Sequence, residues 1–401
     1  MKWMNKGHEF DPLGKIYKNV SKIYFYGACL AAKPLKEQIE NTIRQFNNGV
    51  LDVQFEFVDK NSDKQNETFL DLNVISPKTF YDIFNKDKEI VVLCMNDKNA
   101  VGVWKSLKEH GLDRRINAYN MYEFYRYLSL FMYYRYNKFF LHFLDMFVHT
   151  NCNLNCEHCC VHTYRNVRIH RTEDELKKNI DEMFAKIDYI GIMNFGIAEG
   201  FLGGKTLEYA LQYIINNYSD RFEVIEIVTN GTIVPNEPLL NILKSSKIRV
   251  VVDDYTDNVL LAKEKIEKVK ECLRKNNVNF SVLKREYWEE YEFGNVVDSN
   301  RDMLTQKLTN CICHAKGFAY LGYGQPSTKI YSCVHQTINA YHKIVEEVED
   351  DGIDLIKSSP LEIVEFLLGF TQKGYLSACQ NCNGAFEGKE KLHIPVAVQC
   401  K

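Results

Sequence analysis

Thr150-Asn151-Cys152-Asn153-Leu154-Asn155-Cys156-Glu157-His158-Cys159-Cys160 is the stretch that decides the fold of this chain. Its cysteines Cys152, Cys156 and Cys159 are spaced C-x3-C-x2-C, directly after residues 144–149, which are predicted to form a strand. Three thiolates on one tight loop can bind a soft metal ion or an iron–sulfur cluster. A closed zinc site needs a fourth ligand, for which the sequence offers His158, Cys160 and His162.

The composition of the whole chain favours metal binding over disulfide bonding. Its 401 residues include 13 cysteines, and 50 basic residues against 53 acidic ones give a net charge of −3. The length predicts two or three domains, and the near-neutral charge argues against nucleic-acid binding by bulk charge. No apolar segment typical of a secretory signal follows the first residues, so we expect a cytoplasmic, reducing location, where clustered cysteines more often bind metal.

Residues 116–143 are rich in aromatic side chains and are predicted to form a helical connector between two domains. Charged residues such as Glu123, Arg126 and Arg135 interrupt the apolar run. A membrane-spanning helix needs about 18 apolar residues in a row, so no membrane span is predicted. Peripheral contact with a membrane is the alternative interpretation.

The first 115 residues are predicted to form a small Rossmann-like α/β domain. A strand over 22–27 runs into a glycine turn, a strand over 53–59 ends in an acid, and a third strand covers 89–94. Of the G-x-G-x-x-G fingerprint, however, Gly27-Ala28-Cys29-Leu30-Ala31-Ala32 keeps only the first glycine. We therefore favour a structural or substrate-docking role over an active dinucleotide site. The domain resembles degenerate Rossmann-like domains of some polysaccharide-cluster proteins.

Residues 144–300 alternate between strand and helix patterns, which predicts a parallel sheet, open or closed, with its site at the carboxyl ends of the strands. Thr172 and Glu175 form a capping box at the start of the first helix, predicted over 173–187. The predicted strands cover residues 144–149, 189–195, 224–229, 248–253 and 277–283.

This pattern resembles the radical S-adenosylmethionine (SAM) enzymes, whose signature is C-x3-C-x2-C after the first strand of a partial (β/α)6 barrel. The resemblance implies a [4Fe–4S] cluster held by Cys152, Cys156 and Cys159, with SAM bound at the open iron. It also implies that SAM is cleaved by one electron to a 5′-deoxyadenosyl radical, which abstracts hydrogen from a substrate. His158 fills the position before the third cysteine, usually aromatic, and is expected to contact the cofactor.

Three later motifs follow the order of the family. Glu199 stands where the family carries Gly-Gly-Glu-Pro, although both glycines and the proline are replaced; Thr229-Asn230-Gly231 matches the Thr-Asn-Gly turn; and Asp253-Asp254-Tyr255 resembles the end of the fourth strand in one branch. The resemblance implies cofactor contacts from Glu199, Thr229, Asn230 and Asp253, and catalytic roles for Asp254 and Tyr255. The alternative for Glu199 is a solvated loop acid. The alternative for Asn230-Gly231 is an ordinary Asn-Gly turn. The alternative for Asp253 and Asp254 is that one faces inward and the other is solvated.

Residues 301–401 resemble the twitch/SPASM extension of the family, which carries an auxiliary iron–sulfur cluster. The resemblance implies a second [4Fe–4S] cluster on four thiolates, with Cys311 and Cys400 as substitutes for one of them. A zinc site on the same cysteines is the alternative. The four expected ligands are Cys313, Cys333, Cys379 and Cys382.

The expected protein is therefore an α/β enzyme with a Rossmann-like domain (1–115), a connector (116–143), a radical SAM partial barrel (144–300) and an auxiliary cluster domain (301–401). Oxidoreductase, epimerase or related radical chemistry on a sugar, nucleotide-sugar or other small molecule is implied, with flavodoxin or ferredoxin as electron donor. A maturase of ribosomal peptides is the first alternative; such enzymes often begin with a winged-helix domain, which the α/β pattern does not predict. A non-catalytic zinc-binding interaction protein is the second.

Overall fold

The computed structural model describes residues 1–162, 169, 171–195, 198–259, 262–291, 298–311, 317–321, 328–384 and 393–400. The chain divides into two compact units. One is Asn5–Phe140, and the other joins Met1–Met4 to Leu141–Lys401.

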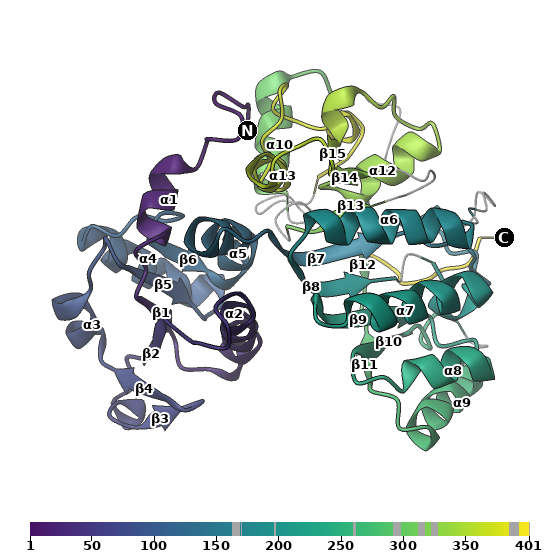
Figure 1. Cartoon of the computed structure of the whole chain (residues 1–401), viewed down its shortest axis with the longest axis horizontal. Coiled ribbons are helices and arrows are strands. Elements are labelled where there is room, and N and C mark those ends of the chain that lie inside the picture. Colours follow the sequence, from purple (N-terminus) through teal and green to yellow (C-terminus); the bar gives the residue numbers. More distant parts are fainter. Residues whose placement is uncertain are drawn as a thin grey trace. The chain divides into compact units, whose positions relative to one another are not determined.

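The unit Asn5–Phe140 is built on a six-stranded sheet in the order β3-β4-β2-β1-β5-β6 (Figure 1). Every neighbouring pair is parallel except β3 and β4. The strands are β1 (Lys22–Tyr26), β2 (Gln54–Val58), β3 (Thr68–Phe69), β4 (Leu72–Ile75), β5 (Glu89–Leu93) and β6 (Ala118–Asn120). The strand order turns back between β1 and β5, which is the Rossmann-type arrangement that the sequence predicts.

The helices of this unit are α1 (Asp11–Tyr17), α2 (Lys33–Phe46), α3 (Pro77–Ile83), α4 (Asp97–Glu109) and α5 (Met121–Tyr136). The segment expected to be a connector thus contains β6, α5 and the first residues of β7. On α5, Phe124, Leu128 and Phe131 are fully buried within this unit, because its aromatic residues face the neighbouring core. Among the described residues, no helix has both the length and the apolar character needed to cross a membrane.

The glycine turn after β1 is closed by the acid after β2. The Asp59 carboxylate accepts a hydrogen bond from the backbone N–H of Ala28 at 2.9 Å, and Lys64 Nζ donates to the Ala28 carbonyl at 2.7 Å. A phosphate bound at this turn would need that same N–H group. In this structure that N–H group is already used within the domain.

The second unit contains an eight-stranded sheet in the order β11-β10-β9-β8-β7-β13-β14-β15 (Figure 1). Five consecutive strands, β7 to β11, form the partial barrel, and β13 pairs in parallel with the free side of β7. The strands are β7 (Phe140–Met146), β8 (Tyr189–Asn194), β9 (Phe222–Thr229), β10 (Ile248–Asp254), β11 (Phe280–Lys284), β13 (Ala319–Leu321), β14 (Lys329–Tyr331) and β15 (Ile353–Asp354).

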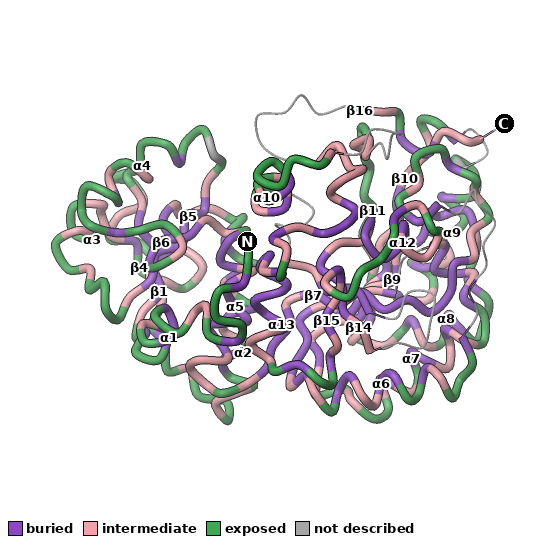
Figure 2. The backbone as a smooth tube through the Cα atoms, turned by 90° about the horizontal axis from the view of Figure 1, so that it is seen from above, coloured by how far each residue is buried: buried purple, intermediate pink, exposed green. Residues whose placement is uncertain are grey.

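The helices between the barrel strands are α6 (Glu173–Lys186), α7 (Gly204–Tyr218), α8 (Glu237–Leu243) and α9 (Ala262–Lys275), with the short η4 (Gly200–Leu202) before α7. The predicted capping box is present, since Glu175 N–H donates to Thr172 Oγ1 at 3.2 Å and Thr172 N–H donates to the Glu175 carboxylate at 2.9 Å. Helices α6 and α7 lie side by side on the sheet (Figure 1). Their positions alternate between buried and exposed, whereas β7 is buried along most of its length (Figure 2).

The remaining elements of this unit follow the barrel. They are β12 (Trp288–Glu289), which pairs with β16 (His393–Ile394), and α10 (Arg301–Asn310), α12 (Val334–Tyr341), η5 (Glu349–Asp351), α13 (Pro360–Leu367) and η6 (Ser377–Gln380). Met1–Met4 also belongs here. Lys2 forms a parallel bridge with Thr371, and Trp3 Nε1 donates to the Glu365 carboxylate at 2.8 Å.

Candidate metal centre

The three spaced cysteines lie on the loop that follows β7. Cys156 is buried, with 6% of its surface exposed, and Cys152 and Cys159 are half-buried. Burial, together with the nearby thiols of Cys159 and Cys152, raises the pKa of the Cys156 thiol to about 12, although a hydrogen bond from Gln399 opposes the shift. Thiols with a raised pKa are deprotonated to thiolates when they bind a metal.

These thiols fit an iron–sulfur cluster by their chemistry, because soft sulfur donors on one loop are its ordinary ligands. Within the parts of the chain that the structure describes, no three His, Cys, Asp or Glu side chains are arranged to hold a single metal ion. His158 has a left-handed backbone, with φ of +56°, and its Nδ1 lies 3.4 Å from Glu290 Oε1. Its expected contact with a cofactor stays a prediction.

The Thr-Asn-Gly turn after β9 is tied to the cysteine loop. Asn230 Nδ2 donates to Asn153 Oδ1 at 3.1 Å and approaches Cys152 Sγ at 3.9 Å, and Asn153 Nδ2 donates to Thr232 Oγ1 at 2.7 Å. Gly231 has φ of +69°, and a Cβ there would lie 2.8 Å from Ile266. Glycine is therefore required at a turn that places Asn230 beside the first cysteine.

Glu199 is fully buried and joins the loops after β8 and β9. Its Oε1 accepts from Thr229 Oγ1 at 2.6 Å and from Phe201 N–H at 3.0 Å, while Oε2 accepts from Asn230 N–H at 2.7 Å. Burial raises the pKa of Glu199 to about 7 although these hydrogen bonds oppose the shift. Glu199 is therefore not a solvated loop acid. The motif residues Gly196 and Ile197 lie outside the described residues.

The two aspartates at the end of β10 have different surroundings. Asp253 is buried, accepts a hydrogen bond from Tyr255 Oη at 3.0 Å, and lies 3.5 Å from Arg285 Nε. Burial raises the pKa of Asp253, and the neighbouring Arg285 opposes this. Asp254 is half-exposed and accepts from the N–H of Thr256 at 3.0 Å. Asp253 thus faces the interior and Asp254 the outside, which matches the inward-and-solvated alternative; catalytic roles for Asp254 and Tyr255 stay predictions.

A comparison with protein families decides what this arrangement is. The family model described as the radical SAM superfamily matches residues 146–275. Residues 146–275 form a radical SAM domain. The domain contains the cysteine loop, Glu199, the Thr229-Asn230-Gly231 turn and the end of β10. A search of curated proteins found no match.

Solved structures that are similar to this chain include the following three, all at low sequence identity. Native anSMEcpe with bound AdoMet is 13% identical, covering 56% of this chain and 84% of that chain, with a TM-score of 0.38. BtrN in complex with AdoMet and 2-DOIA is 16% identical, covering 61% and 94%, with a TM-score of 0.34. Streptococcus suis SuiB bound to the precursor peptide SuiA is 13% identical, covering 71% and 88%, with a TM-score of 0.31. These values carry no argument about the substrate of this chain.

The radical SAM domain also contains a row of polar residues that the sequence analysis missed. It crosses four adjacent strands, because Asn194 pairs in register with Glu226 and Glu226 with Arg249. Asp145 on β7 accepts from Asn194 Nδ2 at 3.2 Å, and Arg249 Nε donates to the Glu226 carboxylate at 3.0 Å. Asp145 is 5% exposed, and among the described residues its Oδ1 has no hydrogen-bond partner. No motif marks these residues, and it is their register across neighbouring strands that brings them together.

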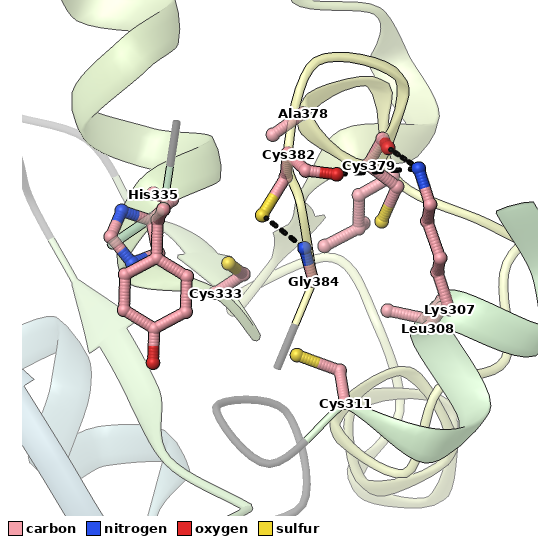
Figure 3. A pocket seen from close by; sticks show the side chains of 11 residues that line it. Lys307, Leu308, Cys311, Cys333, His335, Ala378, Cys379, Cys382 and Gly384 are labelled. Carbon is pink, nitrogen blue, oxygen red and sulfur yellow. Dashed lines mark hydrogen bonds between the residues drawn. The ribbon is translucent and has the colours of Figure 1, made fainter. Parts of the chain in front are cut away.

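A second group of thiols lines one pocket beyond the radical SAM domain (Figure 3). Its cysteines are Cys311, Cys333, Cys379 and Cys382. Burial raises the pKa of Cys379 to about 12 and raises that of Cys333 as well. The N–H of Gly384 donates to Cys382 Sγ at 3.2 Å. Three of the four expected auxiliary ligands thus come together here.

The remaining candidates for this pocket are placed as follows. Cys313 lies outside the described residues, whereas Cys311, named as its substitute, lines the pocket. Cys400, the other substitute, instead lies beside the first cysteine loop, where its N–H donates to the Asn155 carbonyl at 2.7 Å. Lys307 Nζ also reaches the pocket wall and approaches the carbonyls of Cys379 and Cys382 at 3.4 and 3.3 Å.

Proposed function

We propose that this protein is a radical SAM enzyme that reductively cleaves SAM and abstracts hydrogen from a polar small molecule. The observation that carries the proposal is the cysteine loop within a radical SAM domain, fastened to the Thr229-Asn230-Gly231 turn by Asn153 and Asn230. A [4Fe–4S] cluster bound there supplies the electron that cleaves SAM to a 5′-deoxyadenosyl radical.

The protein's own residues hold and orient this chemistry. Cys152, Cys156 and Cys159 would hold the cluster, and the N–H of Leu154 points to Cys152 Sγ at 3.5 Å. Glu199 fixes the ends of β8 and β9 relative to each other, so that Asn230 stays beside the loop. Cys156, Glu199 and Asn230 are buried, which limits the access of water to this part of the site.

The test is SAM cleavage by the reconstituted protein. After anaerobic loading with iron and sulfide, the dithionite-reduced protein should convert SAM to 5′-deoxyadenosine. Cys156→Ala should abolish this product, because a buried ligand of the cluster is lost. Cys272→Ala, on the outer helix α9 of the same domain, is the matched control and should retain activity. Absence of product from the wild-type protein, or equal product from Cys156→Ala, contradicts the proposal.

The polar row supports a small, hydrogen-bonding substrate such as a sugar or nucleotide-sugar. The row offers a substrate groups of both charges and an amide, from Asp145, Asn194, Glu226 and Arg249 on adjacent strands. Asp145 Oδ1 remains able to accept a hydrogen bond. Substrates deuterated at chosen carbons identify the class, because the abstracted deuterium enters 5′-deoxyadenosine. Label arriving from a peptide, and from no small molecule, would favour the maturase alternative.

We also propose a second [4Fe–4S] cluster on Cys333, Cys379, Cys382 and a fourth cysteine, which is Cys311 or Cys313. Four thiols facing one pocket support it. Metal analysis of the reconstituted protein should give about eight irons per chain, and Cys379→Ala should lower this by about half. Comparing Cys311→Ala with Cys313→Ala identifies the fourth ligand. Zinc in place of iron at this pocket contradicts the proposal. We expect a flavodoxin or ferredoxin to be the electron donor.

A further inference from the structure

Residues 398–400 lie against the first cysteine loop and form backbone hydrogen bonds with it. Cys156 and Gln399 stand opposite each other in an isolated antiparallel bridge. Two backbone hydrogen bonds of 2.7 Å flank the pair, from Glu157 N–H to the Val398 carbonyl and from Cys400 N–H to the Asn155 carbonyl. The pairing places the Gln399 side chain next to the buried Cys156 thiol.

The amide of Gln399 has a fixed orientation. Its Oε1 accepts a hydrogen bond from the backbone N–H of Asn155 at 2.8 Å, and its Nε2 donates to the Ala397 carbonyl at 2.7 Å and to Cys156 Sγ at 3.1 Å. A backbone N–H only donates and a carbonyl only accepts, so a flipped amide would lose both backbone partners. One N–H of Gln399 is therefore directed at the sulfur.

The surroundings shield this contact from much of the solvent, although Gln399 itself is half-buried. Val396 and Ala397 are 1% and 0% exposed, and Cys156 is 6% exposed. Ala397 has φ of +55°, which is unfavourable for a residue with a Cβ and persists only where the surrounding structure imposes it. A hydrogen bond sheltered from solvent acts more strongly on the charge of its acceptor than an exposed one does.

We propose that Gln399 is a positioning residue that raises the reduction potential of the cluster on Cys152, Cys156 and Cys159. The inference rests on the proposed function, because it concerns that cluster. Reduction adds one negative charge, which spreads onto the thiolate ligands. An N–H donor aimed at a ligand sulfur stabilises this reduced state more than the oxidised state, and hydrogen bonds to sulfur are among the groups that set cluster potentials.

The experiment measures the potential directly. Wild-type protein, Gln399→Leu and Gln399→Glu are reconstituted anaerobically, and the cluster signal that changes when SAM is added is followed by electron paramagnetic resonance through a redox titration. Gln399→Leu removes the donor and should shift the midpoint to a more negative value. Gln399→Glu keeps an acceptor for Asn155 N–H but turns a carboxylate towards the sulfur, so its shift should be larger. Gln212→Leu, an exposed glutamine on α7, should leave the midpoint unchanged.

The outcomes separate this inference from the function on which it rests. A wild-type protein without a SAM-sensitive cluster overturns both. A loaded wild-type protein whose midpoint equals those of Gln399→Leu and Gln399→Glu overturns the role of Gln399 alone. If Gln399→Leu fails to take up iron, the test rests on Gln399→Glu, because that variant retains the side-chain length and the bond to Asn155. An unshifted midpoint potential in Gln399→Glu then overturns the proposal. Iron and sulfide contents are measured for each sample.

Discussion

Glu199, a buried side chain of the radical SAM domain, makes the stability of the fold depend on pH. It is 0% exposed, and burial raises its pKa from 4.5 to about 7. The folded state therefore keeps a proton that the unfolded state releases at lower pH. Stability from this group is fully present below pH 4.5 and is lost as pH rises through about 7.

We predict that the free energy of unfolding falls by up to about 3 kcal/mol between those two pH values because of Glu199. Glu199→Gln should remove this dependence and should cost about 1–3 kcal/mol at low pH, since an amide NH2 cannot accept hydrogen bonds from the backbone as a carboxyl oxygen does. Urea unfolding of the metal-free protein at several pH values measures both effects. Glu264→Gln, at an exposed position of α9, should behave like the wild type. An unchanged pH dependence in Glu199→Gln would contradict the assignment.

For single residues, the sequence predicted which residues belong to the candidate site better than it predicted which residues contact one another. The spacing of Cys152, Cys156 and Cys159 and the turn at Asn230 were identified from motifs, since loops with special backbone geometry need particular residues. The partner of Cys156 was not predicted, because Gln399 is 243 residues away and lies in no motif. Nor did a motif identify Asp145, since one inward polar residue on a strand has no distinctive pattern.

Among the elements, η6 carries Cys379, and one of the contacts that hold it is the ion pair between buried Asp351 and half-buried Lys373. Asp351 at the end of η5 is 0% exposed. It accepts from Ser377 N–H at 2.7 Å and from Lys373 Nζ at 2.8 Å. These bonds hold the first residue of η6 and the turn before it, so the position of the Cys379 thiol in its pocket depends on them.

We predict that Asp351→Asn lowers the free energy of unfolding by about 3 kcal/mol, because the Lys373 ammonium group loses its partner charge. Iron should be lost from the second pocket while the cluster that SAM perturbs remains. Iron analysis and thermal unfolding measure the two effects. Asp354→Asn is the matched control: its pair with Lys357 is exposed, at 4.0 Å, and should matter little. Full iron content in Asp351→Asn would show that η6 is held by other contacts.

The elements of the barrel could be located from the sequence, but the order of its sheet could not. β10 and α6 lie where alternation and the capping box predict them, since both signals are local. The pairing of β13 with β7 was not predicted. Strands of two or three residues, such as β13 and β15, carry too little periodicity to reveal a partner.

For the whole molecule, the division into two units is the feature with the clearest consequences for stability. Met1–Met4 belongs with Leu141–Lys401, so the unit Asn5–Phe140 is inserted between two parts of the other. Trp3 is 8% exposed, its ring lies 6.5 Å from that of Phe366, and its Nε1 donates to Glu365. The helix α13 is thereby covered by residues from the beginning of the sequence.

We predict that Trp3→Ala destabilises the unit containing the radical SAM domain by about 4 kcal/mol, the usual cost of truncating a buried tryptophan. Hydrogen exchange followed by mass spectrometry should show faster exchange in α13 and around Thr371, with β1, β2 and β5 unchanged. Trp104→Ala on α4 should give the reverse pattern, because that residue belongs to the other unit. Faster exchange in β1 after Trp3→Ala would argue against two separate units.

The bond between Trp3 and Glu365 also sets an order of events during synthesis. The two residues are 362 positions apart, and at about 5–20 residues per second a ribosome needs roughly 20–70 s to make the second after the first. Asn5–Phe140 is complete early in that interval and can fold while translation continues. Met1–Met4 is made before the rest of the unit to which it belongs. It is therefore among the last segments to reach its place.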